Sequence, residues 1–167
     1  MRYKTHSFRF AEQVLNSRLN IKNEILEMID QINSSNIEMS RQNLNNIIEK
    51  KLTEIGWKSQ PVIFDDAKDP SAKLDFIKNR IGMEVQFGHP SFIGIDLLKF
   101  QTLSYSNPNL DRIDVGVYIV TTRAFQKNYI KAGYKWNGSL PYEKVIKYLP
   151  HFRSAIQVPI FVIGLDD

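Results

Sequence analysis

The sequence predicts an α/β fold, in which a mixed central sheet is flanked by helices and preceded by an N-terminal helical layer. Over residues 1–56, apolar side chains recur mostly at intervals of three and four residues, which is typical of amphipathic helices. After Trp57, short apolar runs of strand length alternate with helical stretches, and clusters of Gly, Pro, Asn and Asp separate them. We expect a single domain, 1–167, with the helical layer at 1–56 and the α/β core at 57–167.

The first helix is expected between residues 10 and 32, and a turn cluster, NSSN at 33–36, follows it. Ser40 is suited to cap a second helix at 41–56, which Gly56 ends. The apolar stripes consist of Val14, Leu15, Leu19, Ile25, Leu26, Ile29 and Ile32 in the first helix and Leu44, Ile47, Ile48, Leu52 and Ile55 in the second.

The remaining chain alternates between strands and helices. A loop rich in Asp and Pro covers 65–71, and a tight turn near Asn79 joins two strands. Residues 123–140 contain aromatics and glycines without a clear period, and Pro159 indicates an edge or a bulge in the last strand. The predicted elements are strands at 60–65, 72–78 and 80–88, a helix at 93–107 with Ile95, Leu98 and Leu103 on its apolar face, a strand at 112–122, a helix at 141–152 and a strand at 157–165.

The composition fits a globular protein and excludes several classes. The chain is 43% hydrophobic, which is enough for a buried core. It has no cysteine, so disulfides and thiolate metal sites are excluded and a reducing cytoplasm is the expected location. The opening MRYKTHSFRF is too polar for a signal peptide, and no apolar run approaches the ~20 residues of a membrane helix. The net charge of +4 favours polyanionic partners.

Two carboxylates and an amide stand out among the apolar residues of the predicted hairpin. Side chains alternate along a strand, so Glu84 and Gln86 point to the same face. A turn centred near Asn79 and Arg80 places Asp75 opposite Glu84, with Cβ atoms roughly 5 Å apart. Burying two carboxylates together is costly unless a cation pairs with them.

Mg²⁺ is the cation that this set of oxygens suits, because it prefers carboxylate, carbonyl and water ligands. Asp75 and Glu84 are the candidate ligands, the Val85 carbonyl is a third, and the Gln86 amide is a candidate for orienting water or phosphate. A Mg²⁺ held in this way lowers the pKa of a bound water, as phosphodiester hydrolysis requires. The alternative is a solvated sheet surface, on which Asp, Glu and Gln are also common.

The pattern D-x(8)-E-V-Q-F with a nearby proline resembles the BglII/BstYI group of type II restriction endonucleases, which belong to the PD-(D/E)XK nuclease superfamily. The residues that carry it are Asp75, Glu84, Val85, Gln86, Phe87 and Pro90. Four further segments resemble the group: HSFRFAEQVLN its opening helix, VGVYIVTT its central strand, WNGSLPYEKV its major-groove segment and VPIFVIGL its closing strand. The resemblance implies a restriction-endonuclease-like core.

The resemblance also implies an activity: a homodimer that cuts both strands of a short palindrome in double-stranded DNA, with Mg²⁺ as cofactor and 5′-phosphate ends. Asp75 and Glu84 would bind the metal, and Gln86 would fill the third catalytic position. The segments that follow the motif and enter the groove make His89, Ser91, Asn137, Gly138 and Ser139 the candidates for DNA contact. A cognate DNA methyltransferase is the implied functional partner.

Several other residues have both a functional and an ordinary interpretation. Lys99 is a candidate for phosphate contact or a solvated helix lysine, and Glu24 is a possible additional acid or a surface residue. Asn137 suits adenine recognition, but Asn-Gly is also common in turns. The front helical layer is a candidate for the dimer contact.

Two other functions remain open from the sequence. One is a different nuclease of the same superfamily, used in repair or selective for DNA structure. The other is a DNA-binding domain that has the nuclease core but no turnover.

Overall fold

The computed structural model describes residues 2–33, 37–63, 72–105 and 111–166. The strands in these ranges are β1 (Arg2–Phe8), β2 (Lys58–Ser59), β3 (Phe76–Lys78), β4 (Ile81–Val85), β5 (Val115–Thr121) and β6 (Ile160–Asp166). They form a six-stranded sheet in the order β1-β6-β5-β4-β3-β2, in which β4, β5 and β6 run parallel and the other pairs antiparallel. The predicted mixed sheet is confirmed, whereas the turn at 33–36 and the loop at 65–71 lie almost wholly outside the described residues.

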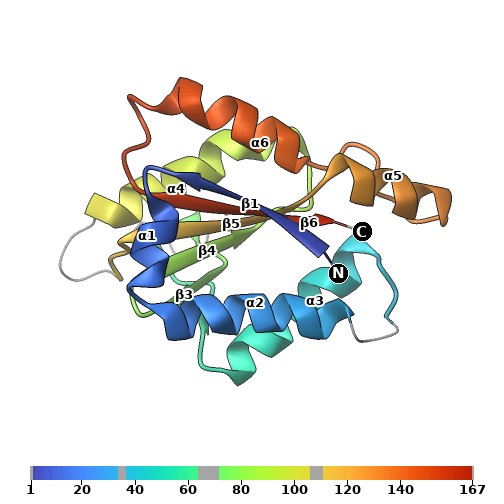
Figure 1. Ribbon diagram of the computed structural model, residues 1–167, viewed down its shortest axis with the longest axis horizontal. Coiled ribbons are helices and arrows are strands. Elements are labelled where there is room, and N and C mark those ends of the chain that lie inside the picture. Colours follow the sequence, from blue (N-terminus) through green and yellow to red (C-terminus); the bar gives the residue numbers. More distant parts are fainter. Residues whose placement is uncertain (1, 34–36, 64–71, 106–110, 167) are drawn as a thin grey trace.

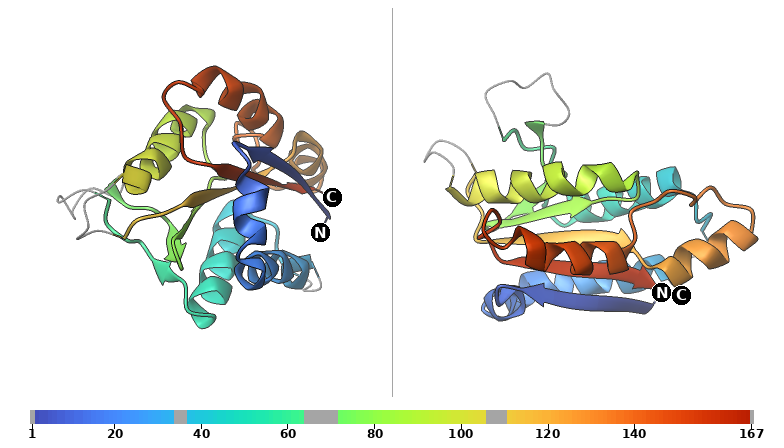
Figure 2. Two further views of the ribbon diagram at one scale, coloured as in Figure 1. Left: turned by 60° about the vertical axis from the view of Figure 1, so that its left-hand side comes forward. Right: turned by 90° about the horizontal axis from the view of Figure 1, so that it is seen from above.

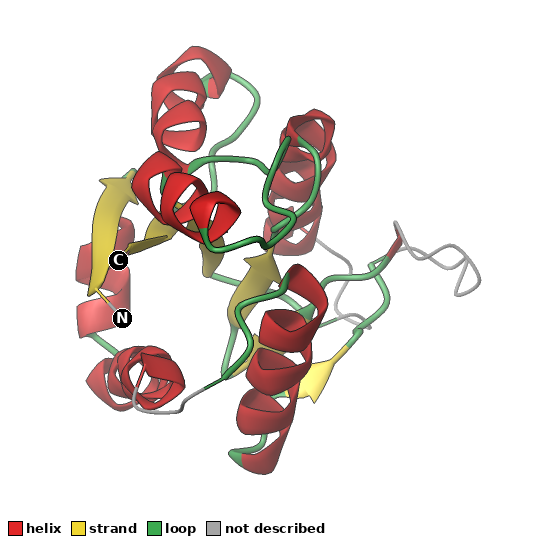
Figure 3. Cartoon of the chain, turned by 90° about the vertical axis from the view of Figure 1, so that its right-hand side faces the viewer, coloured by secondary structure: helices red, strands yellow, loops and turns green. Residues whose placement is uncertain are grey.

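Helices cover both faces of this sheet (Figures 1 and 2). The helices are α1 (Ala11–Asn16), α2 (Leu19–Asn33), α3 (Arg41–Glu54), α4 (Ile93–Tyr105), α5 (Arg123–Lys131) and α6 (Tyr142–Tyr148), with the 3-10 helices η2 (Pro90–Phe92) and η3 (Leu149–Phe152). One buried cluster packs α1, α2 and α3 against one face, and a second packs α4 and α6 against the other. Figure 3 shows the strands enclosed between these helices. Within the described ranges, no helix combines the length and the apolar content that crossing a membrane requires.

The first residues form a strand, which corrects the prediction that the chain opens with helices over 1–56. β1 pairs antiparallel with β6 along its full length, from Arg2↔Asp166 to Phe8↔Ile160. β1 is an edge strand and is only partly buried, so its sequence lacks a strong apolar pattern. Since β1 occupies the edge, β6 is an interior strand, and the prediction of an edge or bulge from Pro159 is wrong.

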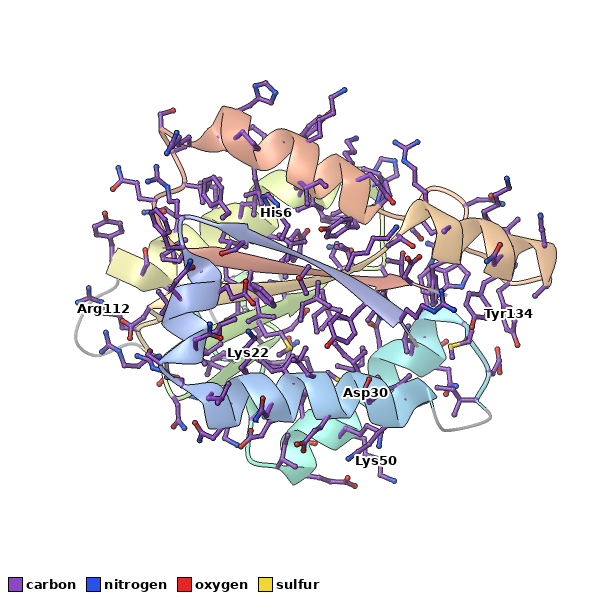
Figure 4. The ribbon with its side chains drawn as sticks, viewed as in Figure 1. His6, Lys22, Asp30, Lys50, Arg112 and Tyr134 are labelled. Atoms are coloured by element: carbon purple, nitrogen blue, oxygen red, sulfur yellow. The ribbon has the colours of Figure 1, made fainter. Side chains whose placement is uncertain are left out.

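The second predicted helix is confirmed together with its cap. The Ser40 hydroxyl accepts a hydrogen bond of 3.3 Å from the Asn43 N–H, and Gly56 has a φ of +87°, a conformation that glycine adopts at little cost. In Figure 4, Lys50 projects from α3 away from the sheet, and the opposite side of the helix packs against α2 and the strands. A further helix, α5, begins the segment for which the sequence showed no clear period.

The hairpin of β3 and β4 has the predicted register. Its pairs are Phe76↔Met83, Ile77↔Gly82 and Lys78↔Ile81. Asn79 and Arg80 form the turn with φ values of +46° and +63°, and positive φ at both central residues is typical of a two-residue hairpin turn. In the described part of the strand predicted at 60–65, residues 60–63, there is one bridge, Val62↔Lys73, and β2 lies just before it.

Two glycines let helices approach the second face of the sheet closely. A Cβ atom at Gly116 on β5 would lie 2.7 Å from the Phe100 ring of α4. One at Gly164 on β6 would lie 2.6 Å from the Tyr142 ring of α6. α4 therefore lies almost directly on the strand next to the motif strand, and its side chains reach the motif.

Asp114 links three segments around the hairpin turn. Its carboxylate binds Arg80 through bonds of 2.5 and 2.8 Å and also binds Arg18, whose guanidinium donates to the Asn79 carbonyl at 2.8 Å. The bond from Arg80, followed by that from Arg18, lowers the pKa of Asp114 from 3.8 to about 2. A lowered pKa means that Asp114 stabilises the fold at pH values above about 4, and that this stabilisation is lost as the pH falls towards 2.

We expect Asp114→Asn to lower the free energy of unfolding at pH 7 by about 1 kcal/mol, after discounting for solvent screening. The difference from wild type should shrink as the pH falls from 5 towards 3, which urea unfolding at a series of pH values measures. Asp111→Asn is the matched control, because Asp111 forms an exposed pair with Lys58. A constant difference across the series would contradict the assigned ionic contribution.

Candidate functional site

Asp75 and Glu84 lie side by side, as the hairpin register requires. Asp75 directly precedes β3, and one further step of the register places it opposite Glu84. Its Oδ2 atom accepts a hydrogen bond of 2.8 Å from the Val85 N–H, which holds the carboxyl against β4. The two acidic side chains are thus brought together by neighbouring strands.

Burial and mutual repulsion make this pair costly to ionise. Burial raises the pKa of Asp75, although the Val85 N–H and the Glu84 side chain oppose this. Burial, and then the charge of Asp75, raise the pKa of Glu84 well above its ordinary value. Two carboxyls that repel each other in a buried position favour the binding of a cation between them.

Lys99 supplies one positive charge from α4. Its Nζ atom lies 3.0 Å from Glu84 Oε1 and 3.6 Å from Asp96 Oδ1. Burial lowers the pKa of Lys99, but Glu84 and the other nearby carboxylates outweigh this and raise it, so the ammonium stays charged. Lys99 is only 8% exposed, and this corrects both predictions for it, since a phosphate contact and a solvated lysine each require an exposed amine.

Gln86 points to the same side as Glu84 and is bound at both ends of its amide. Its Nε2 donates to Asp96 Oδ2 at 2.9 Å, and its Oε1 accepts from the Gly88 N–H at 2.7 Å. The Tyr118 hydroxyl donates to the same Asp96 oxygen at 2.7 Å. Burial, followed by Asp96, raises the pKa of Tyr118 well above its ordinary value, so this phenol remains protonated.

A pocket of about 200 Å³ opens beside Asp75. It is lined by Asn45, Ile48, Glu49, Gln60, Asp75, Phe76 and Val85. Gln60 makes a long contact of 3.5 Å from Nε2 to Asp75 Oδ1. Sequence reasoning missed Gln60, Asn45 and Glu49; the last two are four residues apart on α3, so their spacing could have indicated a polar side of that helix.

The donor set at the pocket fits a hard divalent cation that keeps several waters. Asp75 lines the polar pocket with the Gln60 amide beside it, and the buried Glu84 lies next to Asp75. Among the residues that the structure describes, no group of three or more His, Cys, Asp or Glu side chains is placed to hold a metal. Two carboxylates with waters suit Mg²⁺, which is rarely enclosed by protein ligands alone. The Val85 carbonyl as a ligand stays a prediction.

Glu24 does not join this pair. Its carboxylate forms a 2.7 Å ion pair with Lys78, whose Nζ also donates to the Ile55 carbonyl at 2.6 Å. Glu24 is not among the residues that line the pocket. The ion pair with Lys78 therefore does not support Glu24 as the additional acid, and Glu49 is the helical acid that lines the same pocket as Asp75.

The two candidate DNA-contact segments lie side by side at the end of β4. The Leu140 N–H donates to the Gly88 carbonyl at 2.7 Å, which joins them. His89 and Ser91 are exposed, and their side chains contact each other at 2.9 Å. Asn137 and Gly138 are exposed as well.

Ser139 differs from these neighbours, because it is 3% exposed and its hydroxyl has no hydrogen-bond partner within the described part of the chain. Trp136 is fully buried, donates from Nε1 to the Met39 carbonyl at 2.8 Å and packs edge-on against Phe87 and Phe125. This aromatic side chain is therefore an anchor that fixes the exposed 137–138 turn beside the motif.

Known proteins similar to this chain in sequence and fold include restriction endonucleases. Residues 3–165 match the family described as restriction endonuclease BglII/BglIII. The structure of restriction endonuclease BglII complexed with a DNA 16-mer is similar to this chain, with a TM-score of 0.79 and 22% identity, covering 100% of this chain and 77% of that chain. Free BglII is similar with a TM-score of 0.69 and 20% identity, covering 100% and 80%. A search of curated proteins found no match.

The structural likeness confirms the predicted restriction-endonuclease-like core, because it extends over the whole chain. The family match covers the hairpin with Asp75 and Glu84 as well as both exposed segments at the end of β4. The family match and the fold thus agree. The chain belongs to the BglII/BglIII family of restriction endonucleases and is a site-specific deoxyribonuclease.

Proposed function

We propose that this chain is a Mg²⁺-dependent type II endonuclease that hydrolyses both strands of a short palindrome in double-stranded DNA and leaves 5′-phosphate and 3′-hydroxyl ends. The observation that carries this proposal is the pairing of Asp75 with Glu84 beside a polar pocket. Such a pair, held by a hairpin in a rigid sheet, is well suited to binding a cation next to a DNA backbone.

Asp75 and Glu84 would hold the Mg²⁺ ion, together with the Val85 carbonyl. The Val85 N–H binds Asp75 Oδ2 and Lys99 binds Glu84 Oε1, while Asp75 Oδ1 has only the long contact with Gln60, so the second oxygen of each carboxylate would be the donor for a cation. When bound, Mg²⁺ lowers the pKa of water and stabilises negative charge on the phosphate. Lys99 restrains Glu84, and Gln86 would place an amide proton near the attacking water.

DNA would be read by the exposed residues at the end of β4. His89, Ser91, Asn137 and Gly138 lie on two joined segments, and Asn137 can form two hydrogen bonds with adenine. One similar structure is that of an endonuclease complexed with a DNA 16-mer, which supports duplex DNA as the substrate here. The buried Ser139 and Lys99 are not included in this set.

The outer side of α4 is the surface that we assign to a homodimer. Ile95, Leu98 and Tyr105 project from this helix with 36%, 50% and 69% exposure, and Phe92 precedes them with 49%. The two charged residues of α4, Asp96 and Lys99, both face inward. An uncharged apolar stripe lets two copies of a basic chain meet without repulsion, so α4 replaces the front helical layer as our candidate for the two-fold interface.

A nuclease that cuts a short site must also be prevented from cutting the DNA of its own cell. We therefore include a DNA methyltransferase that modifies the same site as its functional partner. A cytoplasmic location follows from this partnership, and the absence of cysteine supports it.

Digestion of a sequenced plasmid by the purified protein in the presence of Mg²⁺ tests this proposal. We expect discrete bands, and sequencing of the ends should show one palindrome with 5′ phosphates. A smear, or cleavage only at junctions, would instead indicate a different nuclease of the superfamily. DNA binding without cleavage would indicate a domain that has the core but no turnover.

A further inference from the structure

We propose that Asp96 is a positioning residue that fixes the orientation of the Gln86 amide; this role rests on the proposed nuclease function. Asp96 lies in the first turn of α4 and is 2% exposed. Burying a carboxylate is costly, so its partners indicate what it does. Its two short bonds come from Gln86 Nε2 at 2.9 Å and the Tyr118 hydroxyl at 2.7 Å.

The chemistry of the two amide partners allows only one orientation of Gln86. A carboxylate accepts hydrogen bonds, so Asp96 must face the amide nitrogen. The Gly88 N–H can only donate, so it must face the amide oxygen, at 2.7 Å. Turning the amide over would place oxygen against oxygen and nitrogen against N–H. Asp96 accepts a hydrogen bond from one of the two Nε2 protons, and the second proton remains available to donate to water or phosphate.

A simpler role for Asp96 would be to neutralise Lys99. The distances argue against this as its main role, since Lys99 Nζ lies 3.0 Å from Glu84 but 3.6 Å from Asp96. Glu84 is therefore the main counter-ion of Lys99. Asp96 contributes to the site chiefly through Gln86, and Tyr118 fixes the same Asp96 oxygen from β5.

Asp96→Ala tests this inference, because it removes both oxygens that can accept from the Gln86 amide, whereas Asn would keep one. We expect the kcat for DNA cleavage to fall about 10- to 100-fold with KM unchanged. The same substitution in a Gln86→Ala background should cause no further loss, since its effect on cleavage is exerted through Gln86. Asp30→Ala, on the exposed side of α2, is the matched control and should match wild type.

A second measurement needs neither metal nor DNA. In wild-type protein the Gln86 side-chain NH₂ protons, assigned in NMR spectra by their loss in Gln86→Ala, should exchange slowly with water. Asp96→Ala should speed their exchange by about tenfold or more, while Asp30→Ala should leave it unchanged.

Either of two results would overturn the inference: unchanged Gln86 exchange in Asp96→Ala, or a further tenfold loss of kcat when Asp96→Ala is added to Gln86→Ala. The proposed function fails separately, when wild-type protein cuts no DNA. In that event the exchange measurement still decides whether Asp96 orients Gln86.

Discussion

Asp75→Asn and Glu84→Gln are each expected to lower Mg²⁺-dependent DNA cleavage by roughly 10³-fold or more. Both changes keep the size of the side chain and remove the negative charge that Mg²⁺ requires. Asp75→Asn should also preserve or raise the melting temperature of the metal-free protein, because it removes repulsion from Glu84 and can still accept from the Val85 N–H. Single-turnover cleavage of a duplex that contains the site, together with thermal unfolding, measures both effects.

Glu24→Gln is the matched control for these variants, because Glu24 is an acid paired with Lys78 away from the pocket. It should retain cleavage close to wild type. Full activity in either Asp75→Asn or Glu84→Gln would refute the metal-binding roles. Loss of activity in Glu24→Gln, with its stability unchanged, would restore Glu24 as an acid of the site.

In the homodimer that we propose, Leu98→Asp is expected to separate the two copies. Leu98 is 50% exposed at the centre of the α4 stripe, and a two-fold interface would bring two new carboxylates together in an apolar contact. A central interface residue commonly contributes about 2 kcal/mol to binding, and it occurs in both copies of a two-fold dimer. The Kd of dimerisation should therefore rise by about 10³-fold. Sedimentation equilibrium measures this, and cleavage of both strands at one site should fall with it.

Leu19→Asp distinguishes between the two candidate dimer surfaces, the outer side of α4 and the front helical layer. Leu19 is a leucine of similar exposure, 56%, at the start of α2 in the front helical layer. If α4 forms the interface, Leu19→Asp stays dimeric. A monomeric Leu19→Asp variant with a dimeric Leu98→Asp variant would instead place the contact on the front layer.

The hairpin could be predicted from sequence because its determinants are local. Strand alternation sets the faces of Glu84 and Gln86, and the turn at Asn79 and Arg80 sets the register that brings Asp75 opposite Glu84. These features involve only neighbouring residues. They are enough to find the carboxylate pair, but not the groups that reach it from elsewhere in the chain.

The edge strand β1 could not be recognised, because its pairing with β6 joins segments that are more than 150 residues apart. The three residues expected on one apolar face of α4 divide between two sides of the helix, since Leu103 is buried whereas Ile95 and Leu98 are exposed. Periodicity shows that a helix has an apolar side, but not which side the sheet covers. In the folded chain, two features determine which side of α4 faces the sheet. Gly116 permits close approach, and the charges of Asp96 and Lys99 are buried on that side.

The same helix thus has two roles on opposite sides: Lys99 and Asp96 restrain Glu84 and Gln86 from within, while Leu98 and its apolar neighbours face outward. A copy without its proposed partner would hold one Asp75–Glu84 pair, so it could not cut both strands of a palindrome together. We expect dilute, newly made protein therefore to cause few double-strand breaks in the chromosome before the proposed methyltransferase has accumulated.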